Sequence, residues 1–270
     1  MELNVYGREG ATPAYAYTGG RAFDPALPCI VFVHGALHDH SVWTLLARWF
    51  AHHGHGVLAV DLPGHGRSGG APLASIEALA DWLLALLDAA GVERAALVGH
   101  SMGSLIALEA GARAPARAAR LVMVGTAYPM KVSDALLNTA RDAPLRAIDM
   151  VNAFSHSTGA AKPSHPGPGS WLHGSNRALM RRLQAGQTGV NLFHHDFGVC
   201  DRYAGGLDAA AKLRCPASLI LGARDQMTSP KQAQALAQAL KARVQTLDAG
   251  HALMTEAPDA VLAALRSALA

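Results

Sequence analysis

The stretch that most constrains this chain is residues 96–103, where a serine lies between two glycines. A short apolar run typical of a buried strand ends at Gly99, and an apolar helical pattern begins directly after Gly103. Gly-x-Ser-x-Gly in this strand–turn–helix context predicts a tight, strained turn that holds the Ser101 hydroxyl above the end of a sheet. We expect glycine at both flanking positions because a side chain there would collide with neighbouring backbone.

Composition narrows the classes of protein to which this chain can belong. Half of its 270 residues are hydrophobic, which is enough for one large core. The net charge is only +3, and no basic stretch that could bind nucleic acid is present in the sequence. No apolar run reaches the roughly 18–20 residues that span a membrane, and the first residues lack a secretory pattern. The three cysteines are far apart and predict neither a disulfide framework nor a metal site. We therefore expect a cytoplasmic protein that binds neither nucleic acid nor membrane.

Short apolar runs alternate with helical patterns along most of the chain. Residues 29–33 form a continuous apolar run, which is typical of a strand buried on both faces of a parallel sheet. The alternation predicts an α/β fold with a mostly parallel sheet and helices on both faces. A turn at residues 7–10 is expected to join the first two strands. The predicted strands are residues 3–6, 13–17, 29–33, 57–60, 95–98, 121–124, 218–221 and 244–247.

One region breaks this alternation. Residues 127–206 contain no convincing buried strand, and helical patterns cover residues 133–154, 175–185 and 190–203 instead. Because the region lies between two core strands, we interpret it as a mostly helical cap inserted over the carboxyl edge of the sheet. The expected division is a core of residues 1–126 and 207–270 with a cap of residues 127–206.

The loops after the last two predicted strands carry an acid and a histidine. Serine is a weak nucleophile at neutral pH, so it needs a histidine base and a third group that orients the base. Parallel sheets place such groups on the loops after strand carboxyl ends, where Asp225 and His251 occur. We therefore predict Ser101, Asp225 and His251 as a catalytic triad. Asp248 is the alternative acid, which we interpret as a turn former at a strand end.

Acyl transfer also needs hydrogen-bond donors directed at the developing oxyanion. The backbone N–H of Met102 begins the helix after Ser101, where the positive end of the helix strengthens it. The loop after the strand at 29–33 can supply a second donor, and we assign this role to the N–H of Ala36 because Gly35 allows a tight turn. The predicted oxyanion hole therefore consists of Ala36 and Met102.

With these motifs the chain resembles the α/β-hydrolase superfamily. The resemblance is greatest to the capped branch that contains bacterial carboxylesterases, cofactor-free haloperoxidases and meta-cleavage-product hydrolases, and it covers about residues 29–126 and 215–269. The motifs that carry it are His34-Gly35-Ala36 with Trp43, Asp61-Leu62-Pro63-Gly64-His65-Gly66-Arg67-Ser68, Gly99-His100-Ser101-Met102-Gly103, Gly222-Ala223-Arg224-Asp225 and Gly250-His251.

This resemblance implies an eight-stranded, mostly parallel sheet with an inserted cap. It also implies that Ser101 is the nucleophile, Asp225 the acid and His251 the base, with Ala36 and Met102 forming the oxyanion hole. No metal or organic cofactor is implied. In this family the cap determines which substrate is accepted, and the sequence of this cap resembles no known one, so the resemblance does not identify the substrate.

Other side chains in these regions have open interpretations. For His34, His65 and His100 we favour packing and hydrogen bonding around the site. Adjacent histidines at 194 and 195, followed by Asp196, point about 100° apart on a helix, so we predict a solvated or cap-lining helix and no metal site. Seven apolar cap residues either line a pocket or form the core of the cap: Met130, Phe154, Trp171, Met180, Leu192, Phe193 and Phe197.

The sequence therefore predicts a serine hydrolase that cleaves a small to medium, mostly apolar carboxylic ester through an acyl-enzyme. Its expected partner is a small-molecule substrate, and the oligomeric state is left open. Cleavage of C–C bonds in ring-fission products is an alternative that uses the same triad. A ligand-binding receptor or scaffold that keeps the fold is an alternative of another class.

Overall fold

The computed structural model describes residues 1–7, 10–186 and 189–270 of the chain. Eight strands form one sheet: β1 Glu2–Gly7, β2 Gly10–Tyr17, β3 Cys29–Val33, β4 Gly56–Val60, β5 Ala95–His100, β6 Ala118–Val124, β7 Ala217–Gly222 and β8 Arg243–Leu247. Their order is β1-β2-β4-β3-β5-β6-β7-β8. β2 pairs antiparallel with β1 and β4, and the other pairs are parallel. The predicted α/β fold is confirmed; the predicted turn at 7–10 includes residues 8 and 9, which lie outside the described residues.

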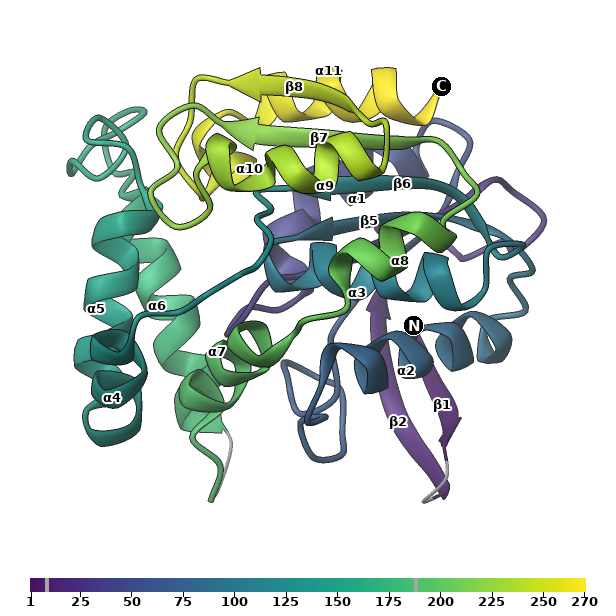
Figure 1. The fold of residues 1–270 in the computed structure, drawn as a ribbon, viewed down its shortest axis with the longest axis horizontal. Helices are drawn as coiled ribbons and strands as arrows, with labels where there is room; N and C mark the ends of the chain where they lie inside the picture. Colours follow the sequence, from purple (N-terminus) through teal and green to yellow (C-terminus); the bar gives the residue numbers. More distant parts are fainter. Residues whose placement is uncertain (8–9, 187–188) are drawn as a thin grey trace.

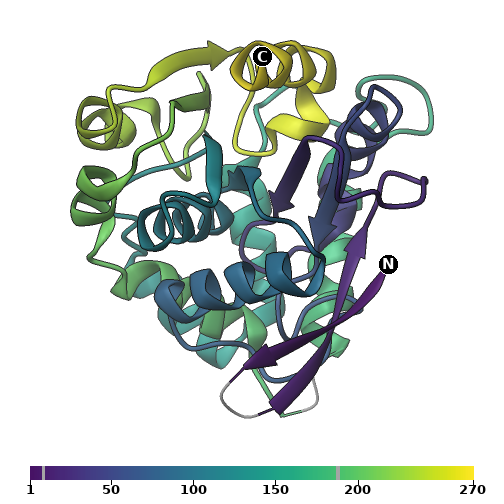
Figure 2. The same cartoon turned by 90° about the vertical axis from the view of Figure 1, so that its right-hand side faces the viewer.

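Helices cover both faces of this sheet (Figure 2). Alternate side chains of β3 enter two different cores, with Val31 and Val33 in one and Ile30 and Phe32 in the other. This two-sided burial explains why the strand is apolar at every position. The helices of these layers and their connections are η1 His40–Trp43, α1 Thr44–Ala51, α2 Ile76–Ala89, α3 Met102–Arg113, α8 Gly206–Lys212, η2 Pro230–Ala233, α9 Gln234–Ala239, α10 Leu253–Glu256 and α11 Pro258–Leu269.

Between β6 and α8 lies a group of helices that we call the helical segment (residues 134–202). It comprises α4 Asp134–Asp142, α5 Pro144–Ser155, α6 Leu172–Gly186 and α7 Leu192–Arg202. In Figure 1 the arrowheads of β7 and β8 point towards the side on which these helices lie. The segment thus lies on the side of the sheet where parallel strands place functional loops. Its role as a substrate-covering cap stays a prediction.

Two details of the helical prediction are wrong. The single helix expected over 133–154 is divided into α4 and α5 at Ala143, whose backbone leaves the helical region at φ −147° and ψ 68°. Pro144 explains the break, because a proline ring disfavours helical backbone at the preceding residue. The sequence also does not predict α8, a short helix rich in alanine. Within the described residues, no helix combines the length and the apolar character needed to cross a membrane.

Candidate active site

Ser101 lies at the junction of β5 and α3 in a strained backbone conformation. Its φ of 52° and ψ of −121° fall outside the regions that side chains normally allow. The sequence predicts that a side chain at either flanking glycine would collide with neighbouring backbone, and the structure agrees. A Cβ on Gly99 would lie 2.0 Å from the Gly103 carbonyl oxygen. A Cβ on Gly103 would lie 2.4 Å from the Val33 carbonyl oxygen. The two glycines therefore let α3 pack directly against β5 and β3.

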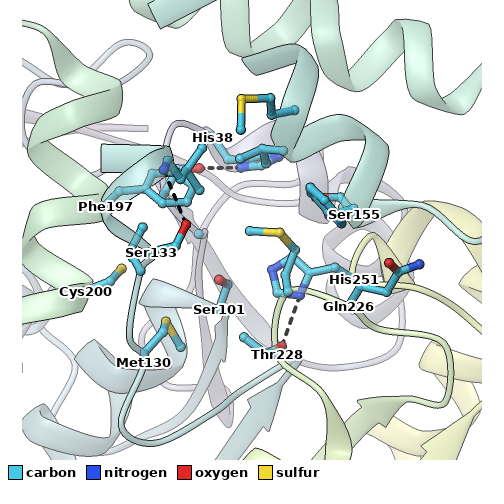
Figure 3. Close-up of a pocket in the computed structure, with 18 of the residues that line it drawn as sticks. His38, Ser101, Met130, Ser133, Ser155, Phe197, Cys200, Gln226, Thr228 and His251 are labelled. Carbon is cyan, nitrogen blue, oxygen red and sulfur yellow. Dashed lines mark hydrogen bonds between the residues drawn. The ribbon is translucent and has the colours of Figure 1, made fainter. Parts of the chain in front are cut away.

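His251 and Asp225 meet beside Ser101, as Figure 3 shows for the histidine and the serine. The Nδ1–H of His251 donates to Asp225 Oδ2 at 2.8 Å, which leaves Nε2 as the atom that can accept a proton. Ser101 and His251 line one cavity, although no hydrogen bond joins them within the described residues. Asp248, the alternative acid, instead pairs with Arg224 at the surface. The structure thus brings the predicted triad together; the catalytic roles stay a prediction.

Thr228 is a polar contact of this pair that the sequence did not single out. Its hydroxyl donates to Asp225 Oδ2 at 2.7 Å and lies 3.1 Å from His251 Nδ1. The backbone N–H groups of Met227 and Thr228 donate to the other oxygen, Oδ1, each at 2.8 Å. Burial by itself raises the pKa of Asp225, but the charge and hydrogen bond of His251 and the two hydrogen bonds from Thr228 hold the pKa below its usual value. Asp225 is therefore suited to remain an anion beside the imidazole.

The backbone around His251 is held by the end of α5. The N–H groups of His251 and Ala252 both donate to the Ser155 carbonyl oxygen, at 2.8 and 3.0 Å. The carboxylate of Glu256 accepts the Gly250 N–H at 3.1 Å and the Ser157 N–H at 3.3 Å. The helical segment is thus joined directly to the loop that carries His251.

The two predicted oxyanion donors come from two different elements of the fold. Ala36 lies in the loop after β3 and lines the same cavity as Ser101, while Met102 is the first residue of α3. In the part of the chain that the structure describes, neither backbone N–H donates to a protein acceptor. Ala36 lines the cavity, so its N–H is available to a ligand there. The role of both groups in an oxyanion hole stays a prediction.

The cavity beside Ser101 has a volume of about 270 Å³ and a largely apolar wall from the helical segment. Of the seven cap residues left open by the sequence, Met130, Phe154, Met180 and Phe197 line it. Leu192 and Phe193 are fully buried in the core instead, and Trp171 is 43% exposed and does not line the cavity. Further apolar lining comes from Val132, Leu136, Met150, Val151 and Met227.

His100 is packed beneath the candidate base. Its Nε2–H donates to the His251 carbonyl oxygen at 3.0 Å, and its Nδ1 is buried without a partner among the described residues. Burial, together with the nearby rings of His251 and His38, keeps the pKa of His100 well below its usual value. His100 is therefore neutral, and its hydrogen bond supports the expected packing role.

Of the two interpretations of α7, solvated or cap-lining, the structure contradicts the first at Asp196, whose side chain is only 2% exposed, while Phe197 and Cys200 of the same helix line the cavity. Asp196 accepts hydrogen bonds from Leu37 and His65 of the core. The helical spacing of the sequence is consistent with this burial. Asp196 falls at helical spacing with Phe193, Phe197 and Cys200, so it lies on the buried face of α7.

Among the described residues, one cluster has the spacing of metal ligands: Asp39, His40 and Asp61. Asp61 Oδ1 accepts both the backbone N–H and the Nδ1–H of His40, and Asp61 Oδ2 accepts the Arg67 N–H. Asp39 Oδ2 accepts from Arg182 at 2.8 Å. Because these carboxylates are already used by protein donors and do not line the Ser101 cavity, we assign no metal to them.

Comparison with curated sequences gives partial matches. The chain is 34% identical over 135 residues to the sn-1-specific diacylglycerol lipase ABHD11 of Mus musculus, covering 50% of this chain and 44% of that protein. It is 35% identical over 99 residues to a putative non-heme haloperoxidase of Mycobacterium phage D29, covering 36% of each. The aligned regions thus span less than half the length of these relatives.

Solved structures match over nearly the whole chain. An enol-lactonase from Burkholderia xenovorans LB400 has a TM-score of 0.81 and 25% identity, with 96% of each chain covered. A thermophilic esterase from Thermogutta terrifontis has a TM-score of 0.82 and 21% identity, with 100% of this chain and 97% of the esterase covered. The family model of the alpha/beta hydrolase fold matches residues 28–258. The chain therefore belongs to the α/β-hydrolase fold family.

Proposed function

We propose that this protein is a serine hydrolase that cleaves small to medium, mostly apolar carboxylic esters. The observation that carries the proposal is the His251–Asp225 hydrogen bond of 2.8 Å at the wall of the cavity that also holds the strained Ser101. A serine, a histidine and a buried carboxylate in this arrangement are the groups that activate a hydroxyl for attack on a carbonyl.

In the proposed reaction, His251 Nε2 takes the proton of Ser101 as Oγ attacks the ester carbonyl carbon. Asp225 stabilises the imidazolium that forms, and the N–H groups of Ala36 and Met102 bind the oxyanion of the tetrahedral intermediate. The intermediate collapses as His251 gives its proton to the departing alcohol. Water then repeats the same steps on the acyl-enzyme, which releases the acid and restores Ser101.

The apolar wall supports the substrate class. Methionine and phenylalanine side chains such as Met130, Met180 and Phe197 form much of the cavity surface, and they would bury a hydrocarbon group of the substrate. Methionine is flexible enough to fit several chain shapes. We further propose that the helical segment acts as a cap, because it supplies this wall and is joined to the His251 loop through Ser155.

Turnover of a panel of substrates tests this proposal. The panel contains p-nitrophenyl esters from acetate to dodecanoate, a small lactone prompted by the likeness to an enol-lactonase, and a vinylogous diketone. We expect ester turnover that falls about 10⁴-fold or more in Ser101→Ala. The exposed Ser175 on α6 does not line the cavity, so Ser175→Ala is the matched control and should retain activity.

Two other outcomes would replace the proposal. Cleavage of the diketone without ester turnover would favour the C–C hydrolase alternative. Tight binding of panel compounds with no turnover of any of them would favour the receptor alternative.

A further inference from the structure

Asp196, on α7 of the helical segment, is a buried carboxylate whose main partners lie in the core. Its Oδ2 accepts the Leu37 backbone N–H at 2.8 Å and the His65 Nε2–H at 2.9 Å. Its Oδ1 lies 3.2 Å from His195 Nδ1. A buried charge is tolerated only when it is paired and hydrogen-bonded, and both conditions hold here.

The partner His65 carries a proton on each ring nitrogen. Its Nδ1 faces the Pro63 carbonyl oxygen at 3.0 Å and its Nε2 faces Asp196, so both nitrogens meet acceptors. Burial alone lowers the pKa of His65, but the charge of Asp196 and these hydrogen bonds raise it above its usual value. Burial likewise opposes the charge of Asp196, yet His65 holds the pKa of Asp196 well below its usual range. The two side chains therefore form a buried ion pair.

The other partner, Leu37, directly follows Ala36 in the loop after β3. Leu37 is fully buried and has a φ of 52°, a left-handed conformation that is costly for a residue with a side chain. Without Asp196 the buried N–H of Leu37 would lack an acceptor, which is unfavourable for a buried polar group. By accepting this N–H, Asp196 stabilises the strained backbone of Leu37, the residue that follows the candidate oxyanion donor Ala36.

We propose that Asp196 is a positioning residue for the oxyanion hole. By holding the Leu37 N–H, packing of α7 on the core fixes the Ala36–Leu37 peptide, and together with the hydrogen bond of His34 to the Gly35 carbonyl oxygen this sets the direction of the Ala36 N–H. The inference rests on the proposed function. It gives one residue of the helical segment, Asp196, a part in positioning an oxyanion donor, although Asp196 is 159 positions away from Leu37 in the chain.

Asp196→Ala and Asp196→Asn test this role, with Asp149→Ala as the matched control. Asp149 lies on α5 and pairs with Arg177 and Arg181 inside the helical segment, away from the loop after β3. For Asp196→Ala we expect kcat to fall about 10–100-fold, less than the loss of a whole donor, with KM changed by at most about twofold. Asp196→Asn keeps an oxygen for the Leu37 N–H and should lose about 3–10-fold. Asp149→Ala should match the wild type.

Affinity for an alkyl boronic acid provides a second readout. Its tetrahedral adduct with serine places an oxygen in the oxyanion hole, so its affinity should fall by the same factor as kcat. A structural role alone would lower the thermal midpoint without changing kcat or boronate affinity of the folded protein. If Asp196→Ala does not fold, Asp196→Asn decides, and wild-type kcat and boronate affinity in that variant would overturn the inference.

The result for the wild type separates this inference from the proposed function. A folded wild type that cleaves no ester and binds no boronate would overturn both. An active wild type with an equally active Asp196→Ala would overturn the positioning role alone.

Discussion

The ring of His34 holds the carbonyl oxygen of Gly35. The Nδ1–H donates to this oxygen at 2.8 Å, and Nε2 accepts the Leu62 N–H at 3.1 Å, which fixes the neutral tautomer. Burial, with the charge of His65, lowers the pKa of His34 to about 4. Because the C=O and N–H of a trans peptide point in opposite directions, this hydrogen bond directs the Ala36 N–H away from His34.

Replacing His34 by leucine should therefore reduce both catalysis and stability. The substitution frees the Gly35–Ala36 peptide to rotate, and we expect kcat to fall by up to about 10²-fold, with KM little changed. The buried Leu62 N–H also loses its acceptor, at a cost of about 1–3 kcal/mol. Steady-state kinetics and urea unfolding measure the two effects.

Ser68→Ala is a control for the loss of stability alone. Its buried hydroxyl bonds the Asp61 carbonyl oxygen and the Tyr15 N–H, outside the Ser101 cavity. The Ser68→Ala variant should be less stable than the wild type, with an unchanged kcat. An equal fall in kcat for Ser68→Ala and His34→Leu would show that the His34 effect is not specific.

Thr228→Val should lower kcat about tenfold, the effect of losing one hydrogen bond to a charged group. The valine removes the hydroxyl that donates to Asp225 Oδ2, so the pKa of Asp225 should rise towards its usual value. Thr228→Ser keeps the donor and should restore kcat. Kinetics as a function of pH check both variants, and a serine variant as impaired as the valine variant would mean that the methyl group, not the hydroxyl, matters.

Met150→Trp should shorten the acyl chains that the enzyme accepts. Met150 lines the cavity from α5, and an indole there would fill part of its volume of about 270 Å³. We expect kcat/KM to fall about tenfold or more for the octanoate ester while the acetate ester is little affected. Leu145→Trp, at an exposed position on the same helix, should leave the profile unchanged. A uniform loss across all chain lengths would contradict this assignment of the pocket.

The protein should become less stable as the pH falls below about 6.5. Burial lowers the pKa values of four histidines, His34, His38, His100 and His156. The unfolded chain, with histidine pKa values near 6.5, then binds more protons than the folded chain, so the free energy of unfolding decreases on acidification. His65 acts in the opposite sense, because its raised pKa gives stability that is lost as the pH rises through the folded value.

Urea unfolding between about pH 7 and about pH 5 measures this dependence, with a slope of at most roughly 1.4 kcal/mol per pH unit for each proton. His156→Gln removes one of the four groups and should make the slope shallower. Constant stability over this range would contradict the neutral state of these four side chains in the folded protein.

The parts of the fold that could be predicted are those encoded locally. The turn at Ser101 needs small residues at fixed neighbouring positions, and the apolar runs of the strands report burial on both faces. Asp225 and His251 follow the last two strands, and they could be predicted to lie near Ser101 because parallel strands end at the same edge of the sheet.

The remaining features depend on packing between distant segments. Whether Met180 or Leu192 faces the cavity follows from how α6 and α7 pack together, which the helical pattern does not specify. Thr228 bonds Asp225 across one turn, but its approach to His251 requires both loops to be in place. The helical spacing of α7 indicates that Asp196 is buried, but its partners could not be predicted because they lie 131 and 159 residues away.

The central claim is that Ser101 is a nucleophile activated by His251. Reaction with a fluorophosphonate probe, followed by mass spectrometry of the intact protein and its peptides, tests it most directly. The account predicts one adduct per chain, located on Ser101, with no adduct in Ser101→Ala and much slower labelling in His251→Ala. A folded wild-type protein that takes up no probe, or an adduct that persists in Ser101→Ala, would contradict it.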